Sequence, residues 1–158
     1  MARRKNIQTI QDIVKHCATE CMKQKSGELS VSHMFDAWIF AVDEEFLWRP
    51  LDNKPFIPTI SFICKLAEMI EPAKNWRKPN FRKLSVIVNE TVIPVTDFQK
   101  NLTTLIKNGW FKENAEEFYF AFEKLHPFID GNGRVGNILY NLLNGSLQDP
   151  VMQPAWRR

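Results

Sequence analysis

The nine residues from His126 to Arg134, His-Pro-Phe-Ile-Asp-Gly-Asn-Gly-Arg, gather several chemically active side chains in one short segment. The segment carries an imidazole that can act as a general base, a carboxylate that can hold a hard cation, and a guanidinium that can bind phosphate. Its two glycines, Gly131 and Gly133, allow a ligand to approach the main chain closely. Together these groups predict a site that binds a phosphate-bearing molecule and acts on it.

A helix is expected directly before this segment. Asn114 with Glu117 three residues later is a capping-box pattern, and apolar residues then recur at helical spacing. Because Pro127 disfavours a helical conformation at the preceding residue, the helix should end at about Leu125. His126 would then lie at the helix C-terminus, where the dipole favours imidazolium, offsets the cost of leaving water and keeps the pKa near working pH.

A second helix should begin near Gly133 or Arg134 and bury apolar residues as far as Leu143. The free N–H groups at such a helix start attract phosphate. The positive charge of Arg134 opposes the dipole there, and a bound anion would remove that conflict. Asp130, beside the same anion, suits Mg²⁺ bridged to phosphates. The alternative is a surface Asp-Gly-Asn-Gly turn with His126 as a cap, which the full nine-residue string disfavours.

The segment resembles the signature of the Fic family, His-Pro-Phe-x-Asp/Glu-Gly-Asn-Gly-Arg-x-x-Arg. Every fixed position from His126 to Arg134 matches, and the final Arg is replaced by Asn137. The resemblance implies a mainly α fold, a Fic-type helical bundle with a small β-hairpin flap. The motif is long and specific and identifies the family, and the change at Asn137 bears on the activity.

The chain as a whole is predicted to form one Fic-like domain. Apolar residues at helical spacing predict a helix over residues 7–24, a second helix capped by Ser30, and a third from about Pro58 to Ile70. A capping box at Thr96 starts a further helix, to about residue 107. The expected parts are N-terminal helices over residues 1–50, the family core over about 58–145 and a tail over 146–158, within a single domain over 1–158.

Residues 81–95 break the helical pattern and predict a β-hairpin that turns at Asn89 and Glu90. Pro94 cannot donate a ladder hydrogen bond, so its strand should be at an edge or leaving the sheet. Such an edge can accept an extended peptide, while a purely structural hairpin is the alternative. In the Fic family a hairpin flap docks the target segment. The resemblance gives this role to the apolar residues Val86, Ile87, Val88, Val92 and Ile93.

Fic proteins mostly transfer AMP from ATP to a Ser, Thr or Tyr hydroxyl of a protein. The resemblance makes His126 the base that deprotonates the hydroxyl, Arg134 the catalytic clamp on the donor phosphates, and Asp130 the Mg²⁺ ligand. The donor-binding set it implies is Gly131, Asn132, Gly133, Arg134 and Asn137. The implied cofactors are Mg²⁺ and ATP or another nucleotide donor, and the implied partner is a protein substrate bound through the flap.

Asn137 is the main departure from the family pattern, because the Arg it replaces helps to hold the terminal phosphates of ATP. A charge-assisted hydrogen bond contributes about 1.5–3 kcal/mol, so the triphosphate would bind differently. The alternatives are a transferase with another donor, a phosphotransferase, or a degenerate module that binds a nucleotide or partner without turnover. The family's inhibitory motif, Ser/Thr-x-x-x-Glu-Gly/Asn, is missing, since the one candidate, Glu113, has Gly109 four residues before it. Either a separate antitoxin-like inhibitor controls the protein, as a toxin or effector, or the loss of the family Arg makes inhibition unnecessary.

Composition narrows the remaining possibilities. The hydrophobic content of 44% with 12% aromatic residues is typical of a globular protein. The net charge of +3 comes from scattered Lys and Arg, which argues against nucleic acid as a partner. Cys17, Cys21 and Cys64 include no CxxC pair, which favours free thiols over a zinc site. Neither a signal peptide nor a membrane span is indicated, and with unpaired thiols this predicts a cytoplasmic protein.

Overall fold

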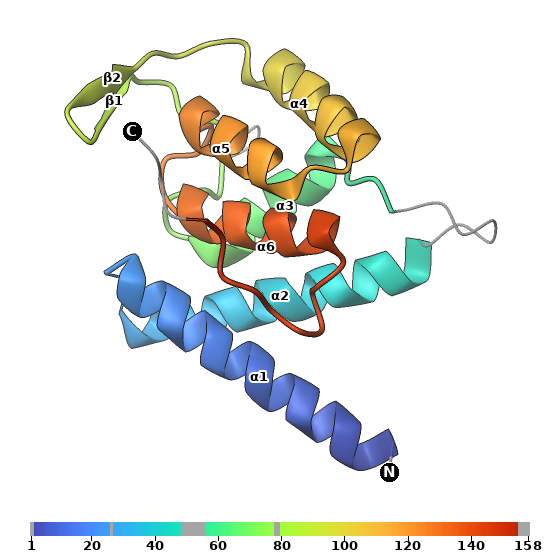
Figure 1. The fold of residues 1–158 in the computed structure, drawn as a ribbon. Helices are drawn as coiled ribbons and strands as arrows, with labels where there is room; N and C mark the ends of the chain where they lie inside the picture. Colours follow the sequence, from blue (N-terminus) through green and yellow to red (C-terminus); the bar gives the residue numbers. More distant parts are fainter. Residues whose placement is uncertain (1, 26, 49–55, 78–79, 155–158) are drawn as a thin grey trace.

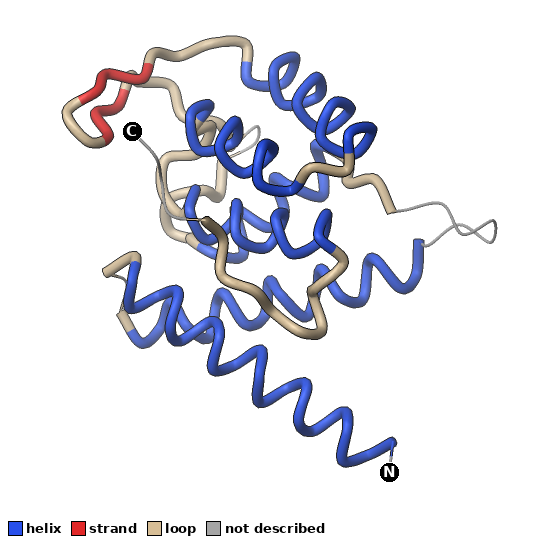
Figure 2. The backbone as a smooth tube through the Cα atoms, viewed as in Figure 1, coloured by secondary structure: helices blue, strands red, loops and turns tan. Residues whose placement is uncertain are grey.

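The computed structural model describes residues 2–25, 27–48, 56–77 and 80–154. Six helices and one two-stranded antiparallel sheet make up this part of the chain (Figure 1). In chain order they are α1 (Ala2–Lys23), α2 (Glu28–Trp48), α3 (Ile60–Ile70), β1 (Val86–Val88), β2 (Thr91–Ile93), α4 (Phe98–Lys112), α5 (Ala115–Leu125) and α6 (Asn132–Asn144). The predicted mainly α fold with a small hairpin is confirmed, and Figure 2 shows how little of the described chain is strand.

Helix α6 lies at the centre of the bundle, because it contacts α2, α3 and α5. Helices α1 and α2 pack against each other on one side, and α4 packs against α5 on the other (Figure 1). The loop that joins α5 to α6 is the segment that the sequence marks for chemistry. Its two flanking helices are therefore held by the packing of the whole bundle.

The core fixes both ends of this loop. Phe122 of α5, Phe128 of the loop and Ile138 of α6 are fully buried, and they join Trp38 of α2 in one hydrophobic cluster. Full burial of such a side chain contributes about 1.5–3 kcal/mol. The loop backbone therefore cannot move far without disturbing the core.

The hairpin stands out from the helices at one end of the molecule (Figure 1). Strands β1 and β2 pair with Val86 opposite Ile93 and Ile87 opposite Val92. Ile87 and Val92 are 73% and 63% exposed, so one face of the hairpin presents apolar side chains to solvent. Pro94 follows the last residue of β2, as expected for a residue that leaves the sheet. The five predicted flap residues thus lie in the two strands.

Several predicted helix boundaries are wrong by a few residues. Helix α1 begins at Ala2 rather than at residue 7, α2 begins at Glu28 rather than being capped by Ser30, α3 is capped by Thr59 after Pro58, and α4 is capped by Asp97 rather than Thr96 and runs on to Lys112. At α4 the reason is local, because the carboxylate of Asp97 accepts the N–H of Lys100 (3.1 Å). Several residues in this region can cap, and the hydrogen bond that forms decides among them.

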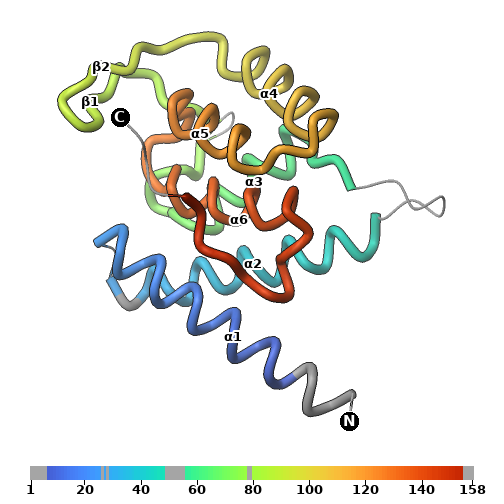
Figure 3. Tube along the Cα trace, viewed as in Figure 1, coloured from blue at the N-terminus to red at the C-terminus, as the bar shows by residue number. Residues whose placement is uncertain are grey.

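Beyond α6 the chain returns across the N-terminal helices (Figure 3). The indole N–H of Trp38 in α2 donates to the carbonyl of Leu147 (2.7 Å), and Gln153 donates to Glu20 of α1 (2.8 Å). Trp156, which the sequence expects to pack on the body, lies outside the described residues. Among the helices described, none is both long and apolar enough to cross a membrane.

Candidate functional site

His126 stands at the end of α5, as the sequence predicts. The side chain of Asn114 caps the start of this helix by accepting the N–H of Glu117 (3.0 Å), and the helix ends at Leu125. His126 then adopts a left-handed conformation (φ 49°) while its N–H donates to the carbonyl of Phe122 (3.0 Å). A non-glycine residue in this conformation is strained, so the surrounding contacts must hold it there.

The guanidinium of Arg82 supplies those contacts. Arg82 is 3% exposed, and its Nε donates to the carbonyl of His126 (2.5 Å). Its other donors reach the carbonyls of Leu84, Ile93, Pro94 and Leu125. One buried cation therefore joins the end of α5 to both sides of the hairpin base. Sequence patterns did not mark Arg82, because all but one of these carbonyls lie far from it along the chain.

The same surroundings keep the imidazole of His126 neutral. Burial lowers the pKa of His126, the positive charge of Arg82 lowers it further, and the backbone of Glu123 and the charge of Asp130 oppose the shift only in part. The predicted helix-dipole effect is thus outweighed by loss of water. A neutral imidazole can accept a proton near neutral pH, which is what a general base requires.

The side chain of Asn132 holds the loop between α5 and α6 in its conformation. This side chain accepts the N–H of Phe128 and donates to the carbonyl of the same residue, both at 2.9 Å. Gly131 has φ 80°, and a Cβ there would approach Ile70 to 2.8 Å, so only glycine fits. The side chain of Asn132 therefore shapes the loop, and Gly131 and Asn132 line the site.

Asp130 is held as an ionised carboxylate. Burial acts to raise its pKa, but hydrogen bonds from Lys74 and from the N–H of Gly131, both 2.7 Å long, lower the pKa below the ordinary value. Asn75, which is almost fully buried, fixes the Asp130 backbone by donating to its carbonyl (3.0 Å). An ionised carboxylate whose present partner is an ammonium group can accept another cation in its place.

Arg134 lies in the first turn of α6 and is 4% exposed. Its Nη2 donates to Glu71 (2.8 Å) and lies 3.7 Å from Asp130. Its Nη1 is buried without a hydrogen-bond partner in the described structure. The helix N-cap, Gly131, provides no side-chain cap either. Both the guanidinium and the helix start thus have donors left for an anion.

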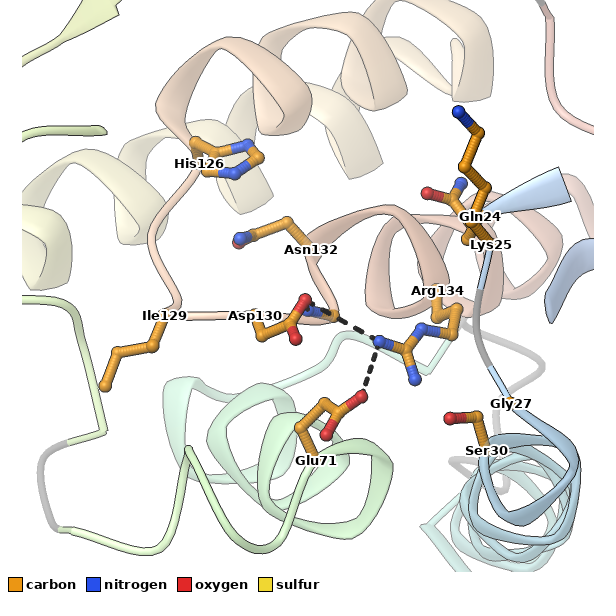
Figure 4. Close-up of a pocket in the computed structure, with 11 residues that line it drawn as sticks. Gln24, Lys25, Gly27, Ser30, Glu71, His126, Ile129, Asp130, Asn132 and Arg134 are labelled. Carbon is orange, nitrogen blue, oxygen red and sulfur yellow. Dashed lines mark hydrogen bonds and ion pairs between the residues drawn. The ribbon is translucent and has the colours of Figure 1, made fainter. Parts of the chain in front are cut away.

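These groups line one cavity of about 310 Å³ (Figure 4). In Figure 4, His126 lies above Asp130 and Arg134 lies to its right, and Gln24 and Lys25 come from the turn that follows α1. The remaining lining residues include Ser30, Glu71, Ile129 and the loop residues 131–132. The cavity combines a base, a carboxylate, cations and free backbone donors, and these are the groups that can bind and transfer a phosphate group.

Gln24 lies against the start of α6. A Cβ built on Gly133 would come within 2.5 Å of Nε2 of Gln24, so a glycine at this position permits the close approach. The same Nε2 donates to Glu20 (3.0 Å). Gln24 thus adjoins the predicted phosphate cradle from a distant part of the sequence, and nothing in its local pattern marked it.

Asn137 does not line the cavity. It is fully buried, its Oδ1 pairs with Nε2 of His16 (2.7 Å), and its Nδ2 donates to Gln153. The structure therefore does not place Asn137 at the donor site predicted beside Arg134. The two residues are one turn apart on α6, but Arg134 turns toward α3 while Asn137 turns toward α1 and the tail.

The sequence around this site matches one known family. A family model described as Fic/DOC family covers residues 62–143, about half of the chain. The chain belongs to the Fic/DOC family. A search among curated proteins found no match. Members of this family are typically transferases, and the matched region contains the hairpin, the loop and α6.

Within this Fic domain the structure brings together most of the predicted site. His126, Asp130, Gly131, Asn132 and Arg134 line one cavity, and Gly133 lies against Gln24, which lines the same cavity. Asn137 is buried outside it. The residues that prediction missed are Gln24, Glu71, Lys74, Asn75 and Arg82. The thiols of Cys17 and Cys21 are free and buried, and that of Cys64 is free and half-buried.

Proposed function

We propose that this Fic protein is a protein adenylyltransferase that moves AMP from ATP to a Ser, Thr or Tyr hydroxyl of a target protein. The observation that carries the proposal is the buried guanidinium of Arg134, whose Nη1 has no partner, beside the uncapped start of α6. A buried unpaired donor is costly, and a phosphate group would satisfy it. The neutral imidazole of His126 lines the same cavity.

In the proposed reaction His126 accepts the proton of the target hydroxyl. The hydroxyl oxygen bonds to the α-phosphorus of ATP, the bond from that phosphorus to the pyrophosphate oxygen breaks, and pyrophosphate leaves. Arg134 and the backbone N–H groups at the start of α6 offset the negative charge on the phosphate oxygens. As in other phosphoryl transfers, positioning and charge neutralisation would supply most of the rate.

The residues present fit a Mg²⁺ ion held jointly by protein and donor. Asp130 is an ionised oxygen ligand beside Arg134, and the described residues contain no group of three or more His, Cys, Asp or Glu that could hold a metal ion. Mg²⁺ commonly binds through one or two carboxylates and completes its shell with phosphate oxygens and water. When bound, it would neutralise charge on the phosphates, and Asp130 would exchange Lys74 for it.

A second candidate is transfer from a different donor, or transfer of a terminal phosphate. The burial of Asn137 favours this alternative, because its side chain is paired with His16 and does not reach the cavity to hold the end of a triphosphate. Lys25 also lines the cavity and provides a cation at a different place. Only a comparison of donors separates the two functions.

Purified protein should be incubated with Mg²⁺, a cell lysate and a panel of nucleotides labelled at the α- or γ-phosphate. Label transferred from α-labelled ATP supports adenylylation, γ-label supports phosphotransfer, and label from another nucleotide supports another donor. Protein without label under every condition would contradict a transferase and leave a binding module. His126→Ala should abolish transfer while retaining the fold and nucleotide binding, whereas His33→Ala on α2, outside the cavity, should transfer normally.

A further inference from the structure

A second hollow adjoins the catalytic loop on the side of the hairpin. It has a volume of about 400 Å³, and its lining includes Lys74, Arg77, Lys83, Leu84, Val86 and Ile129. We call it the basic groove. Ile129 also lines the catalytic cavity, so the two hollows meet at the loop. A chain bound in the groove would therefore lead directly to the site.

The groove lies on the opposite side of Asp130 from the guanidinium of Arg134. Lys74, on the groove side, binds Oδ2 of Asp130, whereas Arg134 lies nearer Oδ1. In Figure 4, Ile129 lies on one side of Asp130 and Arg134 on the other. A donor phosphate held by Arg134 and a chain held in the groove could thus be bound at the same time and approach each other at the loop.

The groove combines positive charge with exposed apolar surface. Among its described lining residues there are four cations and no carboxylate. Arg77 and Lys83 are exposed and form no ion pair with any described residue, while Leu84 and Ile129 are 78% and 52% exposed. Free cations attract carboxylates, and exposed aliphatic side chains favour contact with other apolar groups. An occupant should therefore be both acidic and partly apolar.

The groove is also continuous with the hairpin, since Val86 of β1 belongs to its wall. An exposed strand edge can form backbone hydrogen bonds with an extended peptide along several residues. A small molecule cannot form such a series of hydrogen bonds. We propose that the basic groove binds an acidic, partly apolar segment of the protein that is modified, with its carboxylates near Arg77 and Lys83 and an apolar side chain on Leu84 and Ile129. This deepens the proposed function and rests on it, because the segment would carry the hydroxyl toward His126.

Direct binding tests the groove without any turnover. Short fluorescein-labelled peptides with a central Ser, flanked by Leu and by Glu, Gln or Lys, are titrated with the wild-type protein in the absence of nucleotide. The Glu peptide should bind roughly five- to tenfold more tightly than the Gln peptide, since two exposed charge contacts are added, and the Lys peptide should bind most weakly. The preference should shrink as salt rises.

Charge reversal identifies the groove as the binding surface. Arg77→Glu with Lys83→Glu should remove or invert the preference for the Glu peptide. The matched control, Lys15→Glu with Lys107→Glu, makes the same change of net charge on the exposed faces of α1 and α4 and should leave the preference intact. Equal effects of both double variants would show a response to net charge alone and would overturn the proposal.

Competition distinguishes the occupant proposed here from others. ATP with Mg²⁺ should not displace the Glu peptide, and labelled single-stranded oligothymidine should bind more weakly than that peptide. Displacement by ATP would make the groove part of the donor site, and tighter binding of the oligonucleotide would make it a nucleic-acid surface; either result overturns the proposal. If no donor supports transfer but the Glu peptide still binds in the groove, the proposed function fails and the acidic preference stands. Transfer to lysate proteins that the Arg77 and Lys83 reversal leaves unchanged refutes the groove alone.

Discussion

Replacement of Arg82 by Met should separate the hairpin from the catalytic loop. The guanidinium donates to five backbone carbonyls, two at the end of α5 and three at the base of the hairpin, and its charge lies 4.8 Å from the ring of Phe98. Met fills a similar length but has no donors. The substitution therefore removes every hydrogen bond that joins the two segments through this side chain.

The cost can be worked from the burial of the carbonyls. Leu84 and Pro94 are exposed, so water can replace Arg82 at those positions, whereas Ile93, Leu125 and His126 are partly buried. Leaving these three carbonyls poorly satisfied, at about 1 kcal/mol each from the low end of the usual range, gives a loss of about 3 kcal/mol. For a chain of this length such a loss lowers Tm by roughly 6–12 °C.

The control for this loss is Arg77→Met. Arg77 is also an arginine beside an aromatic ring, 5.1 Å from Trp76, but it is exposed and its loss should cost about 1 kcal/mol or less. Arg82→Lys keeps the charge with fewer donors and should fall between the wild type and Arg82→Met. Thermal unfolding by circular dichroism measures Tm, and hydrogen exchange of the β1 and β2 amides reports the attachment of the hairpin.

The same substitution should change the titration of His126. Burial is the main cause of its lowered pKa and the charge of Arg82 is the next, so removal of the charge raises the pKa. The neutral form is then lost at a higher pH as the solution is acidified, and the acid limb of the pH–rate profile moves to higher pH. NMR titration of the imidazole, assigned with His126→Ala, measures this without turnover. Unchanged Tm, amide exchange and imidazole pKa in Arg82→Met would refute the bridging role.

Two further predictions concern polar residues outside the cavity, Glu123 of α5 and Asn137 of α6. Burial and then the charge of Glu20 raise the pKa of Glu123 to about 7, so the folded protein keeps a proton that the unfolded chain releases near pH 4.5, and stability should fall as pH rises between these values. Glu123→Gln should recover up to about 3 kcal/mol at pH 8 and nothing at pH 4, as urea unfolding can show, and an equal effect at both pH values would contradict the assignment. Asn137→Arg should lower Tm by roughly 2–12 °C through overpacking. It should not raise AMP transfer, because position 137 faces His16 and Gln153, and a faster reaction with ATP would show that the new side chain reaches the donor.

The sequence alone was enough for features that depend on neighbouring residues. The cap at Asn114 and the end of α5 before Pro127 both follow from contacts within four residues or from the proline itself. The hairpin follows from its β-rich strands and its turn. Where several capping residues compete, as at Thr96 and Asp97, the local pattern located the helix start only to within a residue or two.

The tertiary structure decided which of these residues meet, and in what electrostatic state. Arg82 and His126 are 44 positions apart, Lys74 and Asp130 are 56 apart, and Glu71 and Arg134 are 63 apart. No periodicity links such pairs, so the lowered pKa of His126 and the ion pairs at the loop could not be predicted.

Asn137 shows the same limit most clearly. Its helical position relative to Arg134 was predictable, but its partner His16 is 121 residues away. Helical spacing defines a face of α6 only relative to its own axis, and the packing of α1 and the tail decided which side chains on that face are sealed in. The sequence therefore determined the chemistry of the loop, and the assembled bundle determined which of its residues can reach a ligand.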